Sequence, residues 1–215
     1  MSSCSVRSAE LHFASIAEHH MGMPVLHRRR WTAADVRALM DENRPWPRYE
    51  LLDGELLVTP APVASHQLAV GDMYFVLRDY VDAERIGLVV TSPADIELAP
   101  ETIMQPDVFV IPNDVIPAND PLRWQHVTSL LLAVEVLSPS TMREDRIRKR
   151  DFYLANRVDE YWVVDLDARV IERWTSSADR PDIRRDTLTW RPRASSDALL
   201  IDVQGYFARN RGLRQ

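Results

Sequence analysis

Residues 130–141 read LLLAVEVLSPST, and this stretch decides the fold. Seven of its first eight residues are apolar, which is typical of a strand covered on both faces in the middle of a sheet. The break at 138–139 ends the strand, and Thr141 is a suitable N-cap for a helix over about 142–156. Glu135 is the one charged residue in the apolar run, and a buried carboxyl group needs a partner or a proton.

Helix and strand patterns alternate along the rest of the chain. Asp53-Gly54 separates two short apolar runs, which predicts a β-hairpin with strands at 49–52 and 55–58. We expect helices at 32–43, 65–83 and 203–209, and further strands at 87–98, 107–111, 160–165, 169–175, 186–191 and 198–203. This order predicts an α/β fold, in which a mixed central sheet is flanked by helices and preceded by a helix and a hairpin.

The longest predicted helix begins after a proline-rich turn. Ser65 is its expected N-cap. Leu68, Met73 and Leu77 follow at helical spacing, so we expect their side chains on the face that packs against the sheet.

Composition indicates one globular unit. The chain has 215 residues, of which 46% are hydrophobic and 27% charged, enough for one sizeable core. We expect a mobile N-terminal segment at 1–24 and a single domain at 25–215. No apolar run is long enough for a membrane span and no secretory signal is visible, so we expect a cytoplasmic protein. Cys4 is the only cysteine, which excludes an internal disulfide.

The net charge and the types of basic residue are both informative. The net charge of −6 disfavours a protein that coats nucleic acid by bulk attraction. Of the 26 basic residues only Lys149 is a lysine. Arginine and lysine differ where a compact ammonium group must approach a single atom, so this position invites a specific role.

Two acidic residues occupy positions where apolar residues are expected. Asp107 opens a short apolar strand, and Glu135 interrupts the central one. Neither strand contains a basic residue to pair with them. Oxygen ligands of this kind suit Mg²⁺ or Mn²⁺, so the two acids indicate a divalent-metal site. A structural salt bridge is the alternative interpretation for Glu135.

Lys149 can reach these acids from the following helix. Eight helical residues cover about 12 Å, as do about four strand residues, so Lys149 lies level with 133–135. Asp145, Lys149 and Tyr153 are four residues apart and share one helix face. The alternative is an exposed Asp145–Lys149 pair beside a half-buried Tyr153.

Several blocks of sequence occur in a specific order between about residues 31 and 207. The blocks are RYELLDGE at 48–55, SHQ at 65–67, QPD at 105–107, EVLSPST at 135–141, Asp145, Lys149, Tyr153 and EYWVVD at 160–165. Together they resemble the Uma-type putative restriction endonuclease family, which belongs to the PD-(D/E)XK nuclease superfamily.

The resemblance implies a restriction-endonuclease-like core that hydrolyses phosphodiester bonds with a metal ion. Asp107 would be the aspartate of the PD element and Glu135 the second acid. Both would bind Mg²⁺, with Mn²⁺ as a substitute. The superfamily usually has a lysine two residues after the second acid, where this chain has Leu137. In the family the lysine has moved to the following helix, and Lys149 matches that position.

Four further residues match family positions around the site. Glu50 and His66 would be an extra ligand, a water anchor or a phosphate contact. Gln105 would orient the loop of Asp107, and Tyr153 would lie on the helix face of the lysine. The alternatives are a Glu50–arginine pair across the hairpin, a His66 hydrogen bond at the helix start and a Gln105 turn hydrogen bond.

The leading hypothesis is a Mg²⁺-dependent endonuclease that acts on DNA, and the superfamily resemblance implies a homodimer. Two alternatives stay open. One is a catalytically inactive module of the same fold that binds nucleic acid or a protein partner. The other is a plain globular domain in which Glu135 and Lys149 form a structural ion pair.

Overall fold

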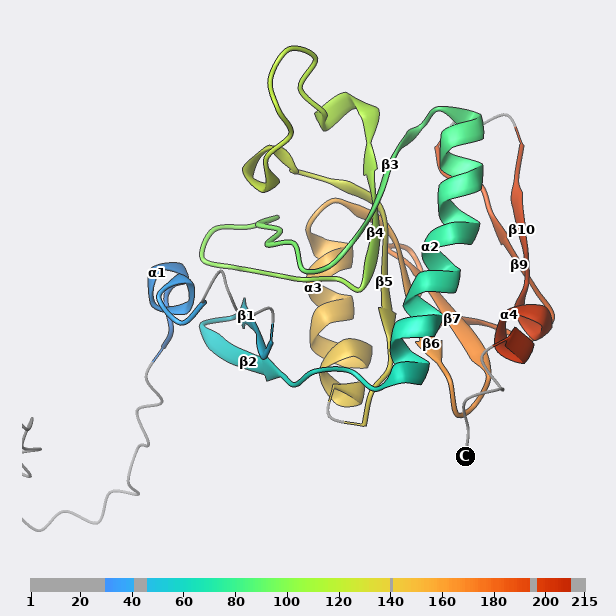
Figure 1. Ribbon diagram of the computed structural model, residues 1–215, viewed down its shortest axis with the longest axis horizontal. Coiled ribbons are helices and arrows are strands. Elements are labelled where there is room, and N and C mark those ends of the chain that lie inside the picture. The colour runs from blue at the N-terminus through green and yellow to red at the C-terminus, as the bar shows by residue number, and fades with distance from the viewer. Residues whose placement is uncertain (1–29, 41–45, 140, 194–196, 210–215) are drawn as a thin grey trace, which may run out of the picture.

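The computed structural model describes residues 30–40, 46–139, 141–193 and 197–209. A mixed six-stranded sheet lies at its centre with helices on both faces (Figure 1), which confirms the predicted fold class. The segment at 1–24 lies outside the described residues, and the single domain at 25–215 stays a prediction.

The elements follow one another in an order close to the predicted one. They are α1 (Ala33–Arg37), β1 (Arg48–Leu52), β2 (Glu55–Thr59), α2 (Ala64–Glu84), β3 (Gly87–Thr91), β4 (Val108–Pro112), β5 (Leu130–Val136), a π-helix (Glu144–Lys149), α3 (Arg150–Ala155), β6 (Val158–Asp165), β7 (Val170–Thr175), β8 (Asp182–Arg184), β9 (Thr187–Trp190), β10 (Leu199–Asp202) and α4 (Val203–Arg209). Short 3-10 turns at Asn113–Val115 and Trp124–His126 lie between β4 and β5.

The central sheet has the strand order β3-β4-β5-β6-β7-β8. Only β5 and β6 are parallel neighbours, so their carboxyl ends meet at the same edge of the sheet, with Glu135 opposite Val163. β5 is buried along its whole length, as the apolar run predicted. Asp107 directly precedes β4, where Val108 pairs with Val134 of β5. The antiparallel register therefore brings Asp107 next to Glu135.

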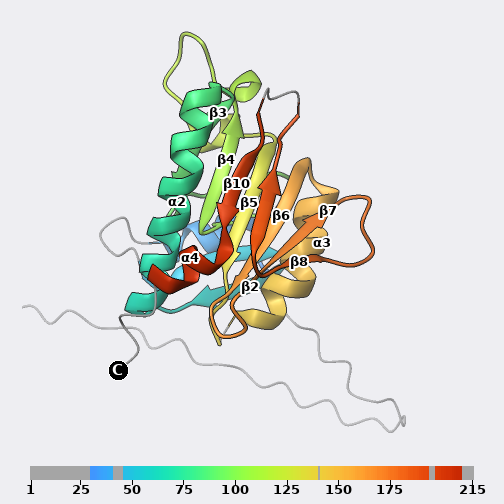
Figure 2. The same cartoon turned by 90° about the vertical axis from the view of Figure 1, so that its right-hand side faces the viewer.

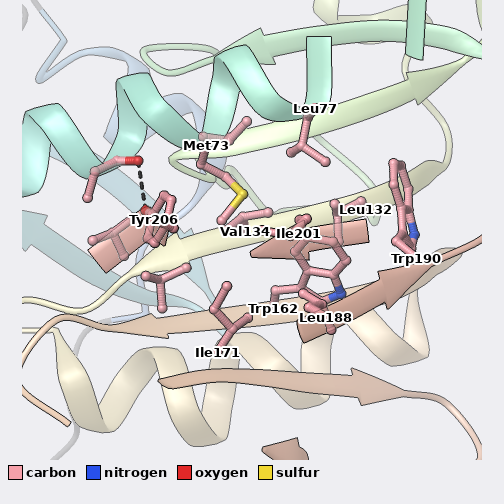
Figure 3. Packing of buried hydrophobic residues seen from close by; sticks show 14 of the residues in the cluster. Met73, Leu77, Leu132, Val134, Trp162, Ile171, Leu188, Trp190, Ile201 and Tyr206 are labelled. Carbon is pink, nitrogen blue, oxygen red and sulfur yellow. Dashed lines mark hydrogen bonds between the residues drawn. The ribbon is translucent and has the colours of Figure 1, made fainter. Parts of the chain in front are cut away.

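Two hydrophobic cores cover the two faces of this sheet. On one face α2 packs together with β9, β10 and α4, which lie side by side over the strands (Figures 1 and 2). Figure 3 shows Met73 and Leu77 of α2 pointing toward Leu132 and Val134 of β5. On the other face α3 packs through Tyr153.

The hairpin of β1 and β2 forms a separate two-stranded sheet. Asp53 and Gly54 both have positive φ, at 55° and 75°, the turn geometry for which this residue pair is suited. Leu51 and Ile103 exchange two backbone hydrogen bonds of 2.8 and 3.0 Å, which join the hairpin to the main body. Side chains two residues apart on a strand share a face, so the charged residues of β1 point the same way.

The helix after Thr141 contains a π-helical segment that the sequence did not predict. The hydroxyl of Tyr161 donates a hydrogen bond of 2.9 Å to the Asp145 carbonyl oxygen, so this helix carbonyl is bound from the sheet. Asp145, Lys149 and Tyr153 are all buried, at 1%, 4% and 0% exposure. The shared helix face is thus confirmed, and the alternative of an exposed Asp145–Lys149 pair is wrong.

The predicted start of α2 was wrong. The helix begins at Ala64, and its N-cap Val63 makes no side-chain hydrogen bond, so Ser65 is not the cap. Leu68 is 47% exposed, because the buried face runs through Ala69, Met73 and Leu77 instead.

Two other elements are shorter than expected. A capping box of Thr32 and Asp35 begins α1, but the helix ends at Arg37, because the next residues are exposed and gain no burial from a longer helix. The predicted end near residue 43 lies outside the described residues. β3 ends at Thr91, since Pro93 has no N–H for the sheet ladder. In the described part of the chain, no helix combines the length and apolar character that a bilayer crossing requires.

Candidate active site

A cavity of about 360 Å³ lies at the edge of the sheet where β5 and β6 end. Five segments of the chain contribute the buried charged or polar side chains of its lining, namely Arg48 and Glu50 of β1, His66 of α2, Gln105 and Asp107 before β4, Glu135 of β5, and Asp145 and Lys149 of the π-helix. The structure therefore brings together the predicted residues in one place. Tyr153 joins them through a hydrogen bond to Glu135.

Asp107 is buried, and each of its carboxylate oxygens lies next to at least one hydrogen-bond donor. The Arg48 guanidinium lies 2.9 Å from Oδ1, while His66 Nε2 and the Val136 N–H lie 3.1 and 3.0 Å from Oδ2. Burial alone would raise the pKa of the Asp107 carboxyl, but these donors together hold that pKa well below its usual range. Asp107 is therefore ionised at neutral pH.

Lys149 lies at the centre of a ring of carboxylates. Its Nζ is 2.8 Å from Glu50 Oε2, 3.1 Å from Glu135 Oε1 and 3.4 Å from Asp145 Oδ1. Burial alone would lower the pKa of the ammonium group, but these three acids raise it well above its usual value. Lys149 is therefore protonated, and the predicted ion pair with Glu135 is part of a larger network.

Glu135 lies where negative charge is in excess. Its Oε1 accepts hydrogen bonds from Lys149 Nζ at 3.1 Å and from the Tyr153 hydroxyl at 3.2 Å. Burial, and then the nearby carboxylates of Asp107 and Asp145, raise the pKa of Glu135 well above its usual value despite the lysine.

The remaining predicted residues have partners other than those expected. Glu50 pairs with Lys149, not with an arginine across the hairpin, and its Oε1 accepts the Gln105 backbone N–H at 2.8 Å. The Gln105 side chain donates to Asp95 Oδ1 at 2.8 Å, so it is the backbone of Gln105 that ties the Asp107 segment to the hairpin. His66 contacts Asp107, so the hydrogen bond expected at the start of the helix is not its role.

Several buried polar atoms of this cluster lack a hydrogen-bond partner among the described residues. They are Arg48 Nε, His66 Nδ1, Gln105 Oε1 and Asp145 Oδ1. Buried polar atoms of native proteins are usually paired, so their concentration around one cavity favours a bound molecule or ion there.

The charge balance of the cavity suits a divalent cation. Glu50, Asp107, Glu135 and Asp145 supply four carboxylates, and Arg48 and Lys149 supply two permanent positive charges. Within the described ranges, no three acidic, histidine or cysteine side chains already converge as metal ligands. Here the acids contact the neighbouring cations instead. The donor set nevertheless fits Mg²⁺, because hard oxygen ligands are present in excess over positive charge.

Arg48 and Asp145 belong to the cluster, although the sequence did not single them out as site residues. Arg48 is two residues from Glu50 on one strand, and Asp145 is four residues from Lys149 on one helix. Both positions lie inside the sequence blocks quoted above. The spacing along each element could have found them, because residues two apart on a strand or four apart on a helix share a face with the known site residue.

Known proteins resemble this chain in sequence and in fold. The sequence profile of the Uma2 family, described as putative restriction endonuclease, matches residues 34–196, more than half of the chain. The chain therefore belongs to the Uma2 family. No curated protein matches it.

A solved structure shares the fold. It is described as a putative nuclease belonging to DUF820 from Anabaena variabilis, and it aligns with a TM-score of 0.69 over 83% of this chain and 98% of that chain. The two sequences are 17% identical, so the likeness concerns the fold. Family and fold together support a nuclease in general terms.

Proposed function

We propose that this protein is an endonuclease that hydrolyses phosphodiester bonds of DNA with Mg²⁺, for which Mn²⁺ substitutes. The observation that carries this proposal is the convergence of four buried carboxylates and the only lysine of the chain in one cavity. Membership of the Uma2 family supports the reaction class.

Each residue has a role in this proposal. Asp107 and Glu135 would hold the metal ion. A bound Mg²⁺ lowers the pKa of a water molecule and offsets negative charge on the scissile phosphate. Arg48 and His66 position Asp107 through hydrogen bonds to its two carboxylate oxygens. Tyr153 does the same for one oxygen of Glu135.

Lys149 would act on the reacting groups directly. Glu50 and Asp145 hold its ammonium group beside Glu135, where it can donate a hydrogen bond to the attacking water or to the phosphate oxygens as their charge increases.

A homodimer completes the proposal, since a duplex has two strands to cut. The mass of the protein in solution, measured by light scattering, tests that part.

Cleavage of supercoiled plasmid tests the reaction. We expect relaxed and linear products with Mg²⁺ or Mn²⁺ and none with EDTA. Asp107→Asn and Lys149→Met should each lower the cleavage rate by about 10²-fold or more, because each removes a group that acts on the transition state. The exposed Asp120→Asn is the matched control and should cleave like wild type. Cleavage that persists in both site variants would contradict the proposal.

A second candidate function is an inactive module of the same fold that binds nucleic acid or a protein. The ion pairs that surround Lys149 favour it, because they also suit a structural network. Calorimetry separates the two functions. Mg²⁺ binding that disappears in Glu135→Gln supports the enzyme, whereas DNA binding that is indifferent to the metal supports the module.

A further inference from the structure

The turn between β6 and β7 forms part of the cavity wall. Because β5 and β6 are parallel, this turn lies at the same sheet edge as the segment that follows Glu135. Leu166, Asp167 and Arg169 of the turn line the cavity together with Val136. The β6–β7 turn is thus adjacent to the carboxylate cluster but is no part of it.

Hydrogen bonds to one carboxylate fix the shape of this turn. Asp165 Oδ1 accepts the backbone N–H groups of Asp167 and Ala168 at 3.0 and 2.8 Å. Its Oδ2 lies 2.6 Å from the guanidinium of Arg146, which also contacts Glu172. Arg169 follows with a φ of 54°, in the left-handed region that ends the turn. The backbone of Arg169 is therefore held in place by contacts that leave its side chain uncommitted.

Arg169 differs from the other cationic side chains of the cavity. Arg48 is paired with Asp107 and Lys149 with three acids. Among the described residues, no acidic side chain forms an ion pair with Arg169, which is half-buried in the cavity wall. Its guanidinium is thus available to an anion that enters the cavity.

We propose that Arg169 is a substrate-binding residue that contacts a DNA backbone phosphate flanking the scissile one. This inference rests on the proposed function. An arginine suits the task, because its planar guanidinium can hold two phosphate oxygens at once. It would also offset the repulsion between a phosphate and the surplus of carboxylates in the cavity.

The experiment compares Arg169→Gln with Arg180→Gln, which removes the same charge in the exposed connection between β7 and β8. Binding of a short fluorescein-labelled DNA duplex is measured by anisotropy with Ca²⁺ in place of Mg²⁺, at several salt concentrations. Cleavage of the same duplex is measured with Mg²⁺. Arg169→Gln should raise the Kd about 10-fold and reduce the salt slope by about one, since one phosphate contact is lost.

The kinetic parameters give a second readout. Arg169→Gln should raise KM about 10-fold and leave kcat nearly unchanged, whereas Arg169→Lys should restore part of the loss. Arg180→Gln should resemble wild type in both assays.

The outcomes distinguish the two proposals. If wild type cleaves DNA and Arg169→Gln behaves like Arg180→Gln, the role of Arg169 is overturned and the nuclease stands. If wild type binds DNA without cleaving it and Arg169→Gln binds more weakly, the contact of Arg169 with a DNA backbone phosphate stands and the nuclease is overturned. Wild-type protein that neither binds nor cleaves DNA overturns both.

Discussion

The side chain of Lys149 has three carboxylate neighbours and almost no exposed surface. An ammonium group is compact, and the Lys149 Nζ lies within 3.4 Å of an oxygen of each acid. A planar guanidinium needs more room and a flat arrangement of acceptors. The cluster thus explains why this position holds lysine in a chain whose other basic residues are all arginine.

Lys149→Arg tests this explanation. The charge is kept, but the larger group overpacks the cluster, so we expect the cleavage rate to fall by about 10²-fold or more and the free energy of unfolding by about 1–3 kcal/mol. Cleavage of plasmid and urea unfolding measure the two effects. Arg180→Lys, at an exposed site, should change neither. Full activity of Lys149→Arg would show that only the charge matters.

At this scale the sequence predicted the members of the cluster better than their pairing. Asp107, Glu135 and Lys149 come together because strand register and helix rise are regular. The two strands contain no basic residue, as the sequence shows, but Arg48 and His66 reach Asp107 from a different sheet and a different helix. Which cation meets which acid depends on tertiary packing, which local periodicity does not encode.

Among the elements, the π-helix is bound at a backbone carbonyl oxygen by a tyrosine hydroxyl from the sheet. Tyr161→Phe removes the hydroxyl that binds the Asp145 carbonyl oxygen, so the turn that carries Asp145 and Lys149 is less firmly placed. We expect a loss of about 0.5–1.5 kcal/mol in unfolding free energy and a lower kcat.

Tyr80→Phe is the matched control for this change. Tyr80 lies on a part of α2 that is distant from the π-helix, and its hydroxyl donates a hydrogen bond to the carbonyl oxygen of Asp197. The substitution removes this hydrogen bond. A similar loss of stability with unchanged kcat is expected there. Equal kcat in Tyr161→Phe and wild type would contradict a positioning role for Tyr161.

The β6–β7 turn gives stability that depends on pH. Burial alone would raise the pKa of the Asp165 carboxyl, but the Ala168 N–H and Arg146 hold it below its usual value. Because the folded-state pKa is the lower one, the stabilisation is complete above the unfolded-state pKa of about 3.9 and is lost as pH falls through the folded-state pKa.

Urea unfolding of Asp165→Asn and wild type at several pH values measures this effect. At pH 7 we expect the variant to be less stable by about 1–3 kcal/mol, and the difference should shrink below about pH 4. The exposed Asp120→Asn should show no comparable difference. A difference that stays constant down to the acid transition would contradict the assignment to Asp165.

The helices and strands were predictable where a strand is buried on both faces or where a turn has a strong local signal. β5 and the hairpin were predicted because apolar runs and Asp-Gly are strong local signals. The cap of α2 and the π-helix were not, since Val63 begins a helix without a side-chain bond and Tyr161 acts on a residue 16 positions away. Both depend on neighbours that a sequence window does not contain.

For the whole molecule, the surplus of carboxylates predicts that a divalent cation stabilises the fold. A ligand that binds only the folded state at about 100 times its Kd adds about 2.7 kcal/mol to the free energy of unfolding. We expect Mg²⁺ to raise Tm in wild type and in Asp120→Asn, and to have little effect in Glu135→Gln. Thermal unfolding with Mg²⁺ or EDTA measures it. A Tm independent of Mg²⁺ in all three proteins would contradict a metal site.

The hairpin of β1 and β2 supplies Arg48 and Glu50 to a centre whose other members come much later in the chain. During translation the hairpin leaves the ribosome first, while Lys149 has yet to be synthesised. No growing chain can hold the complete set of charged groups before the π-helix has emerged and the hairpin has docked against Ile103. The proposed active site is therefore incomplete in the growing chain until the π-helix has emerged, because its parts are made at different times.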